Sequence, residues 1–564
     1  MNGERIACRG RLRWALAAVT ASAVIGAGPG GEREDCNGNG IEDAEDVASW
    51  GTAFDDATTW AAFDPGDEGV GADPDGYWGC VFDGRYVYFV PSDNGTAPHG
   101  EVLRYDTEGD YAEAASWATY DPGFHGVGKK PDGYADGVFD GRYIYFAPFR
   151  NAGGDHGEVL RYDTQGDFFE TASWAAYDPG DHGVGEDPDG YNGAAFDGRY
   201  VYFAPYDNGT AHHSEVLRFD TTGDFESVDS WATFDPRDFG VSEKYGYAGA
   251  LFDGQYVYFV GNCTSDTSHH GEMLRYDTQG DFFDPAAWQA YDPGDCGVGD
   301  DPDGYAGAVY DGQYVYFVPC YKEPDFWHCE MLRYDTHMAF DSVKAWKTYN
   351  PDGEGIGDNP EGYSGAVFDG RFVYYVPAVS DPGANDEFLR YDTGVGNFQD
   401  KAAWTAFRPK MFGVGEEANG FCGAAYDGRH MYFSPMRWAN PHGEIMRYDT
   451  AAVGSPDCNG NGIPDECEVD DGSAADCNGN GVPDECDIAH GFSWDADGDG
   501  VPDECTEECP EDVDGDGVVD VLDLLAVLSS WGDTGGGLPA DVNGDGVVDV
   551  LDLLAVLGAW GPCG

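Results

Sequence analysis

A stretch of about 57 residues occurs seven times in this chain, and this repetition limits the folds that the chain can adopt. One copy contains Gly193 to Pro205, Glu215 to Thr221 and Ser230 to Pro236. A tryptophan marks each copy, and successive tryptophans are 57 or 58 residues apart: Trp60, Trp117, Trp174, Trp231, Trp288, Trp346 and Trp404. A period this constant predicts a repeat architecture.

Each copy contains four short runs rich in Val, Tyr, Phe and Trp, which Gly, Pro and Asp clusters separate. This pattern is typical of strands joined by turns. The first two runs meet at Asp-Gly, for example Asp83-Gly84, and this dipeptide suits a type I′ hairpin. Four-stranded units that cannot bury their own faces pack radially, because a ring leaves only short edges. We therefore predict a mainly β chain, in which residues 54–450 form a seven-bladed β-propeller.

The seventh copy supplies only three strand runs, the last of them Glu444 to Asp449. The segment Trp60 to Asp64 precedes the first complete copy and is the spare fourth strand. We expect it to complete blade seven, in a three-plus-one closure. The strand order resembles that of kelch-type propellers, although Val-Pro or Ala-Pro replaces the double glycine typical of kelch repeats.

The closure predicts that Cys80, in the first inner strand, lies near Cys422, in the last. A disulfide between them would join the ends of the ring. Loop positions suggest two other candidate pairs, Cys263 with Cys296 and Cys320 with Cys329.

The 564 residues include 106 acidic and 29 basic side chains, giving a formal charge of −77. Such a surface repels phosphate backbones and anionic lipid, which argues against nucleic-acid and peripheral membrane binding. Cations are the partners that it attracts.

Residues 1–28 resemble a secretory signal, because four arginines precede the apolar run Trp14 to Val19 and small residues follow near Ala27. A short membrane anchor is the alternative, but the run is shorter than the roughly 20 residues of a span. No later stretch is apolar enough to cross a bilayer. We therefore expect a secreted or cell-surface protein; without Cys8, 14 cysteines remain, an even number that favours disulfides.

Oxygen-bearing side chains recur at positions 1, 3, 5, 9 and 12 of short loops with glycine at position 6. This is the ligand spacing of an EF-hand-type calcium loop. Loop one lies in the N-terminal region 29–53, and loops two to four lie in 455–508. The predicted Ca²⁺ ligands are Asp35, Asn37, Asn39, Asp43 and Asp46 in loop one; Asp457, Asn459, Asn461, Asp465 and Glu468 in loop two; Asp476, Asn478, Asn480, Asp484 and Asp487 in loop three; and Asp495, Asp497, Asp499 and Asp503 in loop four.

Loops two to four are spaced by 19 residues and have no apolar helix between them. They resemble thrombospondin type 3 repeats, which implies that calcium and disulfides replace a hydrophobic core. Cysteines stand at loop positions 2 and 11, as Cys458 and Cys467, then Cys477 and Cys486, while loop four has only Cys505. Pairing within a loop and pairing between loops are both compatible with this pattern.

Residues 509–564 contain two further loops, each followed by the same segment, Val-Leu-Asp-Leu-Leu-Ala-Val-Leu. Leucines at helical spacing, Leu522, Leu525 and Leu528 and their counterparts in the second copy, predict one shared apolar stripe. The predicted Ca²⁺ ligands are Asp512, Asp514, Asp516, Asp520 and Asp523 in loop five, and Asp541, Asn543, Asp545, Asp549 and Asp552 in loop six.

This duplicated loop–helix unit resembles a dockerin type I module, a small α-helical pair of EF-hand-like units that docks to a cohesin. The resemblance implies calcium binding and a cohesin-like partner. The chain departs from the usual pattern before the last ligand of each loop, where Val521-Leu522 and Val550-Leu551 replace small hydroxyl residues. Cys509 and Cys563 bracket the module and could clasp its ends, or Cys509 could pair elsewhere, for instance with Cys505.

Histidine, glutamate and arginine recur before and within the third strand of the blades. A residue present in every blade is more economically a structural device, such as an Arg–carboxylate bridge, than part of one active site. The recurring histidines are His99, His156, His213, His270, His328 and His442, with Asn385 in blade six.

Functional candidates are better sought where a blade departs from the repeat, on the face that carries the long loops. Blade five inserts a segment ending at Trp327, blade seven has Trp438, and blade two has Lys129 and Lys130. Exposed aromatic rings beside polar groups can stack on sugars, so a glycan or a protein is the expected ligand. We predict a non-catalytic binding or scaffold protein. The alternative is an extracellular carbohydrate-active enzyme, a glycoside hydrolase or polysaccharide lyase that carries a dockerin.

Overall fold

The computed structural model describes residues 36–37, 41–265, 268–322, 326–380, 383–395, 397–436, 441–459, 461–477, 482–490, 493, 500–502, 505, 513, 518–519, 521–531, 540, 542, 547–548, 550–558 and 561–562. The chain divides into two compact units, residues 1–492 and 493–564. The predicted signal sequence, residues 1–28, lies outside the described residues.

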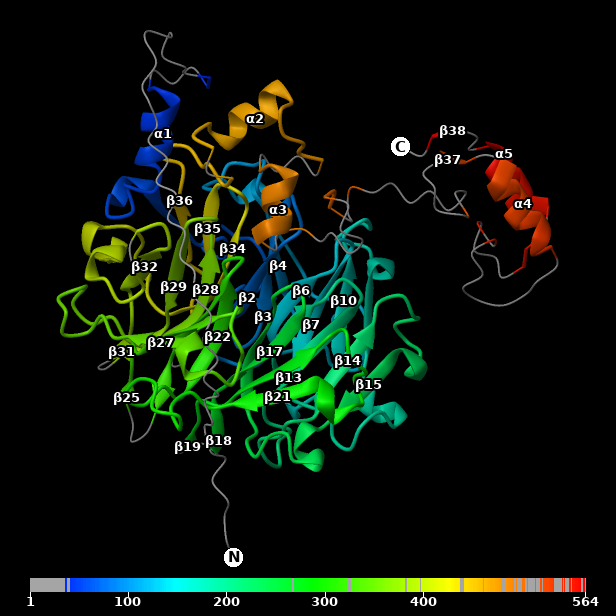
Figure 1. Cartoon of the computed structure of the whole chain (residues 1–564), viewed down its shortest axis with the longest axis horizontal. Coiled ribbons are helices and arrows are strands. Elements are labelled where there is room, and N and C mark those ends of the chain that lie inside the picture. Colours follow the sequence, from blue (N-terminus) through cyan, green and yellow to red (C-terminus); the bar gives the residue numbers. More distant parts are fainter. Residues whose placement is uncertain are drawn as a thin grey trace, which may run out of the picture. The chain divides into compact units, whose positions relative to one another are not determined.

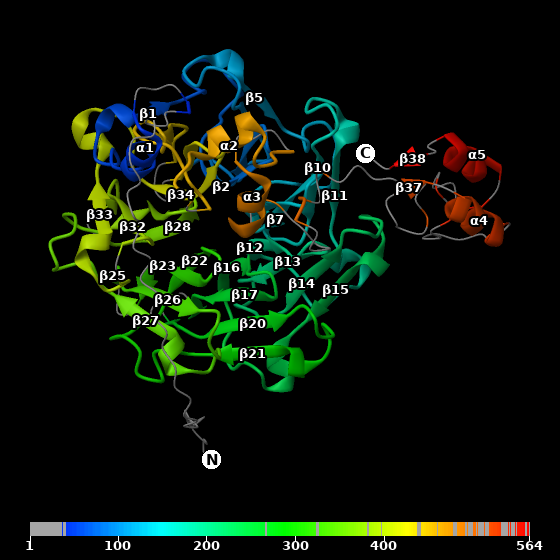
Figure 2. The same cartoon turned by 45° about the horizontal axis from the view of Figure 1, so that its top comes forward.

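Seven four-stranded antiparallel sheets form the blades of the first unit, arranged as a ring (Figure 1, Figure 2). Blade one contains β2 (Tyr77–Phe82), β3 (Tyr86–Pro91), β4 (Val102–Asp106) and β5 (Trp117–Tyr120), paired in that order. Blade two contains β6 (Tyr134–Phe139), β7 (Tyr143–Pro148), β10 (Val159–Asp163) and β11 (Trp174–Tyr177), and blade three contains β12 (Tyr191–Phe196), β13 (Tyr200–Pro205), β14 (Val216–Asp220) and β15 (Trp231–Phe234). Blade four contains β16 (Tyr247–Phe252), β17 (Tyr256–Gly261), β20 (Met273–Asp277) and β21 (Trp288–Tyr291), and blade five contains β22 (Tyr305–Tyr310), β23 (Tyr314–Pro319), β26 (Met331–Asp335) and β27 (Trp346–Tyr349). Blade six contains β28 (Tyr363–Phe368), β29 (Phe372–Pro377), β32 (Phe388–Asp392) and β33 (Trp404–Phe407). The predicted mainly β, seven-bladed propeller is confirmed.

Blade seven closes the ring with a strand from the other end of the repeat. Its sheet contains β34 (Phe421–Tyr426), β35 (His430–Pro435) and β36 (Ile445–Asp449). The fourth strand is β1 (Trp60–Phe63), which pairs with β36 from Trp60 opposite Tyr448 to Phe63 opposite Ile445. The three-plus-one closure is therefore confirmed.

A single turn of 3-10 helix precedes the outer strand of each blade. These turns are η1 (Ala57–Thr59), η2 (Ala114–Ser116), η3 (Thr171–Ser173), η5 (Val228–Ser230), η7 (Pro285–Ala287), η8 (Val343–Ala345) and η9 (Lys401–Ala403). Three more, η4 (Gly180–His182), η6 (Pro236–Phe239) and η10 (Pro409–Phe412), lie in the loops after outer strands.

The recurring arginine joins neighbouring blades through aromatic rings. Arg104 lies over Tyr86 of its own blade and over Phe168 of the next, with its guanidinium carbon 4.2 Å from each ring centroid. The expected Arg–carboxylate bridge is formed by a different arginine, which follows the Asp-Gly turn, as in Arg85–Asp106. Arg390 of blade six lies over Phe54 in the same way, so Phe54 belongs structurally to blade seven.

Glycines let the inner strands approach closely. A Cβ atom on Gly193, whose φ is +129°, would lie 2.5 Å from the Cα of Gly249 in the next blade. The same strand position is glycine in every blade except blade two, where it is Asp136. The carboxylate of Asp136 accepts hydrogen bonds from the Gly137 and Ala194 amides, which joins blades two and three.

The two faces of the propeller differ in what covers them. The helices α1 (Asp43–Ser49), α2 (Asp465–Asp471) and α3 (Asp484–His490) lie on the side of the Asp-Gly turns, where the Ala489 carbonyl approaches Gly312. The short hairpins lie on the opposite, long-loop face (Figure 1). They are β8 (Arg150–Asn151) with β9 (Gly154–Asp155), β18 (Cys263–Ser265) with β19 (Ser268–His269), β24 (Tyr321–Lys322) with β25 (Phe326–Trp327), and β30 (Val379–Ser380) with β31 (Gly383–Ala384).

The predicted disulfide between Cys80 and Cys422 was wrong. The inner strands do adjoin, but both sulfurs point the same way around the ring. Cys80 Sγ faces the carbonyl oxygen of Tyr432 in blade seven, and Cys422 lies beside Ser364 in blade six. Both thiols are free.

The other two propeller disulfides were also predicted wrongly. Cys320 and Cys329 are free thiols, and Cys329 Sγ contacts Asn350 Oδ1 at 2.9 Å. The sulfur of Cys263 contacts the Tyr206 hydroxyl instead of forming a bridge with Cys296.

The second unit contains α4 (Val521–Ser529), α5 (Val550–Gly558) and a short pair of β37 (Val518–Val519) with β38 (Gly561–Pro562). Its core is made by valines such as Val527 and Val556, whereas Leu525 and Leu557 are about half exposed. The predicted leucine stripe is therefore not the internal contact. Asp523 and Asp552 are completely buried. Residues four positions apart lie on the same face of a helix, so Val527 and Val556 turn inward together with these aspartates.

Within the part of the chain that the structure describes, no helix is both long and apolar enough to span a membrane.

Candidate functional site

The recurring histidines hold the backbone of the propeller. His156 Nε2 lies 3.4 Å from the Gly133 carbonyl oxygen, and its Nδ1 accepts a hydrogen bond from the Glu158 amide. Asn385 makes the equivalent contacts in blade six, to Glu361 O and from the Glu387 amide. The side-chain amide of Asn385 thus replaces the imidazole and keeps both contacts with the backbone. This supports a structural role for the recurring histidine.

The recurring glutamates hold the long loops that connect successive blades. The carboxylate of Glu158 accepts hydrogen bonds from the backbone amides of Lys129 and Lys130. Glu387 does the same for Asp358 and Asn359. These carboxylates are therefore occupied with loop geometry in blade after blade.

The structure does not gather the four predicted ligand-binding residues into one site. Trp327 lies in β25 on the long-loop face, with its ring centroid 4.9 Å from that of Tyr321. Lys129 and Lys130 lie in blade two, where Lys129 forms an ion pair with Asp181. Trp438 lies outside the described residues.

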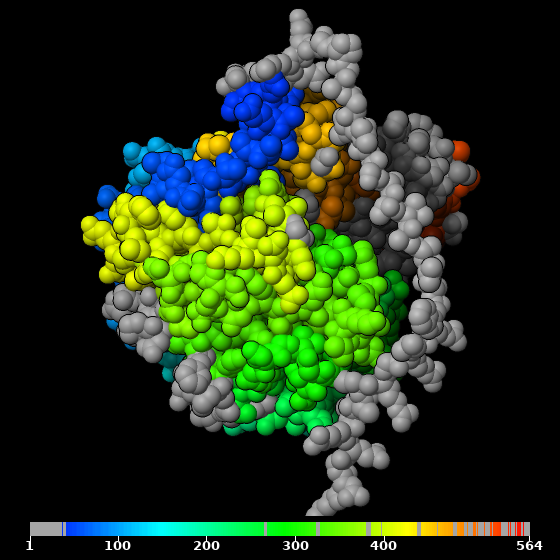
Figure 3. Space-filling model, turned by 60° about the vertical axis from the view of Figure 1, so that its left-hand side comes forward, coloured from blue at the N-terminus to red at the C-terminus, as the bar shows by residue number. Residues whose placement is uncertain are grey.

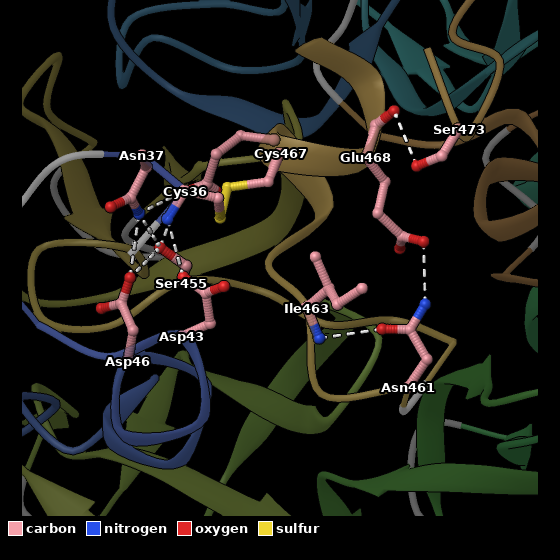
Figure 4. The surroundings of a disulfide bond; sticks show 11 residues. Cys36, Asn37, Asp43, Asp46, Ser455, Asn461, Ile463, Cys467, Glu468 and Ser473 are labelled. Carbon is pink, nitrogen blue, oxygen red and sulfur yellow. Dashed lines mark hydrogen bonds between the residues drawn. A yellow bond between two sulfur atoms is a disulfide. The ribbon is translucent and has the colours of Figure 1, made fainter. Parts of the chain in front are cut away.

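Loops one and two contact each other although the whole propeller separates them in sequence (Figure 4). A disulfide joins Cys36, at position 2 of loop one, to Cys467, at position 11 of loop two. Asn37 Nδ2 donates to Asp46 Oδ2 in its own loop and to Glu466 Oε1 in loop two, both at 2.9 Å. Figure 3 shows the blue N-terminal segment against the orange segment that contains loop two.

Loops two and three repeat these contacts. Cys458, at position 2 of loop two, is bonded to Cys486, at position 11 of loop three. Asn459 Nδ2 donates to Glu468 Oε2 and to Glu485 Oε1, the equivalents of the two Asn37 contacts. Loop one is therefore the first member of the same stack as loops two and three. Sequence reasoning missed this; the signal was that loop one has cysteine only at position 2.

The donor set of these loops fits a hard, oxygen-liganded cation. Acids at positions 9 and 12 are buried wherever the structure describes them: Asp43, Asp46, Asp465, Glu468, Asp484, Asp487, Asp523 and Asp552. Burial, together with repulsion from Asp457, Glu468 and Glu466, raises the pKa of Asp465 from 3.8 to about 7. Buried carboxylates that repel one another are costly without a compensating positive charge.

Several predicted ligands lie outside the described residues, so their arrangement is not described. They are Asp35, Asn39, Asn478, Asn480, Asp495, Asp497, Asp499, Asp503, Asp512, Asp514, Asp516, Asp520, Asp541, Asn543, Asp545 and Asp549, and the bracketing Cys509 and Cys563 are outside as well.

In the second unit, the paired strands β37 and β38 bring Val518, ahead of α4, beside Pro562, near the chain's end. Two near-identical helices each begin beside a buried aspartate, Asp523 or Asp552, and pack through a small valine core. The described residues thus form two equivalent helices, with a strand pair that joins the residues before α4 to those after α5. Residues 510–558 match the dockerin type I domain family.

The dockerin match covers only the C-terminal part of the chain. Dockerin type I domains typically bind calcium and attach secreted proteins to a cohesin partner. No curated protein matches the chain. The match therefore bears on residues 510–558 alone, and the propeller has to be interpreted from its own residues.

Proposed function

We propose that the protein is a secreted, calcium-dependent, non-catalytic binding protein. Its dockerin attaches it to a cohesin-like protein, and its propeller presents the long-loop face to a protein or glycan ligand. Calcium would be held by the acids and amides of loops one to six, and it would neutralise their buried charge.

The observation that carries this proposal is a duplicated apolar surface on the dockerin. Leu528 on α4 is 47% exposed, and Leu557, its equivalent 29 residues later on α5, is 48% exposed. Val521 and Val550, which are also equivalent, are each about half exposed. A module this small does not expose so many large apolar side chains without a partner to cover them. Val521 and Val550 stand where the usual dockerin pattern has hydroxyl side chains, and Leu528 and Leu557 add exposed apolar area, so the cohesin surface that fits them is apolar.

The contacts of the recurring residues support a non-catalytic propeller. Imidazoles and carboxylates that would serve as acids and bases hold backbone groups instead, blade after blade. An enzyme would need a group of acids unique to one place on the ring. The enzyme alternative therefore has less support than the binding function.

Docking can be tested with the full-length protein and a panel of immobilised cohesin modules, in Ca²⁺ and in EGTA. We expect Ca²⁺-dependent binding by the wild type. Since the two apolar faces are equivalent, Leu528→Glu or Leu557→Glu alone should weaken binding modestly, and the double variant should abolish it. Phe124→Glu, on an exposed propeller position, is the matched control. Unchanged binding by the double variant would refute the proposed surface.

The propeller ligand can be tested by a glycan and secreted-protein screen with the same chain. Trp327→Ala and Trp438→Ala should each reduce capture of the ligand at least tenfold. If both variants bind every captured ligand as the wild type does, the long-loop tryptophans are not the site.

A further inference from the structure

A thiol and two imidazoles, side chains that bind transition metals, lie near one another where blades three and four adjoin on the long-loop face. Cys263 begins β18, and His269 ends β19 directly opposite it. His212 comes from blade three, one residue before the recurring His213. His212 and His269 occupy equivalent positions at which the other blades carry no histidine: Pro98, Asp155, Trp327, Ala384 and Pro441. These histidines thus depart from the repeat and have no part in the backbone contacts described above.

The sulfur and the first imidazole already lie at the separation of two ligands on one metal ion. His212 Nε2 is 3.7 Å from Cys263 Sγ. Bond lengths of about 2.3 Å to sulfur and about 2.0 Å to nitrogen, at a tetrahedral angle, place two zinc ligands about 3.6 Å apart.

The other nitrogen of His212 is fixed by acceptors. Nδ1 lies 3.2 Å from the Tyr206 carbonyl oxygen and 3.3 Å from Asp207 Oδ2. Since both neighbours accept hydrogen bonds, Nδ1 carries the proton and Nε2 directs its lone pair toward Cys263. A carboxylate behind a histidine in this way is the usual outer shell of a metal-binding imidazole.

The second imidazole lies across the hairpin from Cys263. Neither of its nitrogens is within 4.8 Å of both Cys263 Sγ and His212 Nε2, so the ring has to turn toward the ion to complete the site. Residues directly opposite in an antiparallel pair have Cβ atoms about 4.5–5.5 Å apart, which puts His269 beside Cys263. Nδ1 of His269 is buried without a hydrogen-bond partner among the described residues.

We propose that Cys263, His212 and His269 bind a late first-row transition metal ion, Zn²⁺ being the expected one, with Asp207 orienting His212. Nitrogen and sulfur donors select such ions over the Ca²⁺ that oxygen ligands prefer. Binding requires the thiolate, so Cys263 releases its proton to solvent. The Tyr206 hydroxyl, 3.2 Å from the sulfur, can then donate to the thiolate.

Such an ion would tie the β18–β19 hairpin to blade three. The ring of Tyr321 packs on His269 with centroids 5.0 Å apart, and Trp327 packs on Tyr321. The metal would therefore stiffen the part of the long-loop face that carries the candidate ligand-binding tryptophan.

Cys263, His212 and Asp207 are also arranged like the thiol, imidazole and carboxylate of a cysteine nucleophile with its general base. Cys263 is only 4% exposed and the side chain of His212 only 7%. A buried group of this kind is accessible to an ion but not to a bulky substrate. The observations therefore favour the metal.

The test uses the full-length protein, stripped of metal and then held in excess Ca²⁺ so that the acidic loops are filled. Zn²⁺ is titrated against a competing indicator, and Co²⁺ is added separately to detect thiolate-to-cobalt absorption. We expect one Zn²⁺ per chain, loss of that site in Cys263→Ser, and at least 100-fold weaker binding in His212→Gln and His269→Gln. Asp207→Asn should weaken binding about 10- to 100-fold.

Cys329→Ser and His125→Gln are the matched controls, since each removes a thiol or an imidazole elsewhere in the propeller. Near-ultraviolet circular dichroism checks that every variant is folded. A wild type that binds no Zn²⁺ at micromolar concentrations, or Cys263→Ser binding as tightly as the wild type, would overturn the proposal. Zn²⁺ should also protect Cys263 from iodoacetamide in the wild type, and equal labelling with and without Zn²⁺ would count against the site.

Discussion

Cys36 and Cys467 are joined by a disulfide although 431 positions separate them, and their Cα atoms lie 5.9 Å apart. The bond connects loop one to the helix of loop two. The entire propeller is thus inserted between two successive members of one loop stack. Two devices hold the ends of the ring together: the pairing of β1 with β36 and this covalent link.

Removing that link should destabilise the propeller. We expect Cys36→Ser combined with Cys467→Ser to lower the free energy of unfolding by about 3–5 kcal/mol, because the unfolded chain loses a very long closed loop. Urea unfolding followed by tryptophan fluorescence measures the change. Cys80→Ser is the control, since Cys80 is a free thiol. A double variant no less stable than this control would show that strand pairing alone closes the ring.

The pairing of the cysteines follows a rule that extends beyond the two observed bonds. In each, position 2 of one loop is bonded to position 11 of the next, as in Cys36–Cys467 and Cys458–Cys486. Applied to the sequence, the rule predicts that Cys477 pairs with Cys505. It also explains why loop four has alanine, Ala496, at position 2: no further loop of this kind follows. Peptide mapping under non-reducing conditions should recover the Cys477–Cys505 peptide, and any other partner of Cys477 breaks the rule.

The propeller could be predicted from sequence because its repeat states the strand pattern seven times, and the missing fourth strand of the last copy identified Trp60 as the closing strand. The disulfides could not, because pairing depends on side-chain direction: Cys80 and Cys422 lie on adjoining strands but point the same way around the ring. The prediction that leucines form the internal contact of the dockerin was wrong for a related reason. Helical spacing shows which residues share a face of a helix, but not which face turns inward. The burial of Asp523 shows which face does. The Cys263 cluster depends on contacts between two blades, which spacing along the chain does not show.

Arginines that look alike in sequence should differ in their contribution to stability. The guanidinium carbon of Arg218 lies 4.1 Å from the ring centroid of Tyr200 in its own blade and 4.0 Å from that of Phe282 in the next blade. Arg199 forms an ion pair with Asp220, and its side chain is 58% exposed. We expect Arg218→Met to cost about 1–2 kcal/mol and Arg199→Met less than about 1 kcal/mol. Equal losses in chemical unfolding would show that the stacking between blades is not stabilising.

Chelation should unfold the loops and the dockerin while the propeller stays folded. The loops have little apolar core, so their buried acids such as Asp465 and Asp523 need the ion. Limited proteolysis of the full chain with and without EGTA is analysed on reducing gels, because disulfides hold fragments together. It should show new cleavage only in the loop regions, before residue 54 and after residue 455. Asp523→Ala with Asp552→Ala, kept in Ca²⁺, should expose only the dockerin. A cleavage pattern unaffected by EGTA would contradict calcium-dependent folding.

Asp136, the acid that replaces glycine on the inner strand of blade two, should make the propeller less stable as the pH rises. Burial raises the pKa of its carboxyl from 3.8 to about 6. Between these two values the folded protein holds a proton that the unfolded chain has lost, so this group's stabilisation is complete below pH 4 and gone above pH 6.

The matched variant is Asp136→Asn, which keeps the shape of the side chain and cannot titrate. Because the Asp136 side chain is only partly buried, we expect the stability difference between wild type and variant to change by about 1–2 kcal/mol from pH 4 to pH 7. Over that range the free energy of unfolding of the wild type should fall relative to that of the variant. Other carboxyl groups titrate in both proteins, so the difference between them isolates Asp136. Parallel profiles in urea unfolding would mean that the Gly137 and Ala194 amides hold the carboxylate ionised throughout.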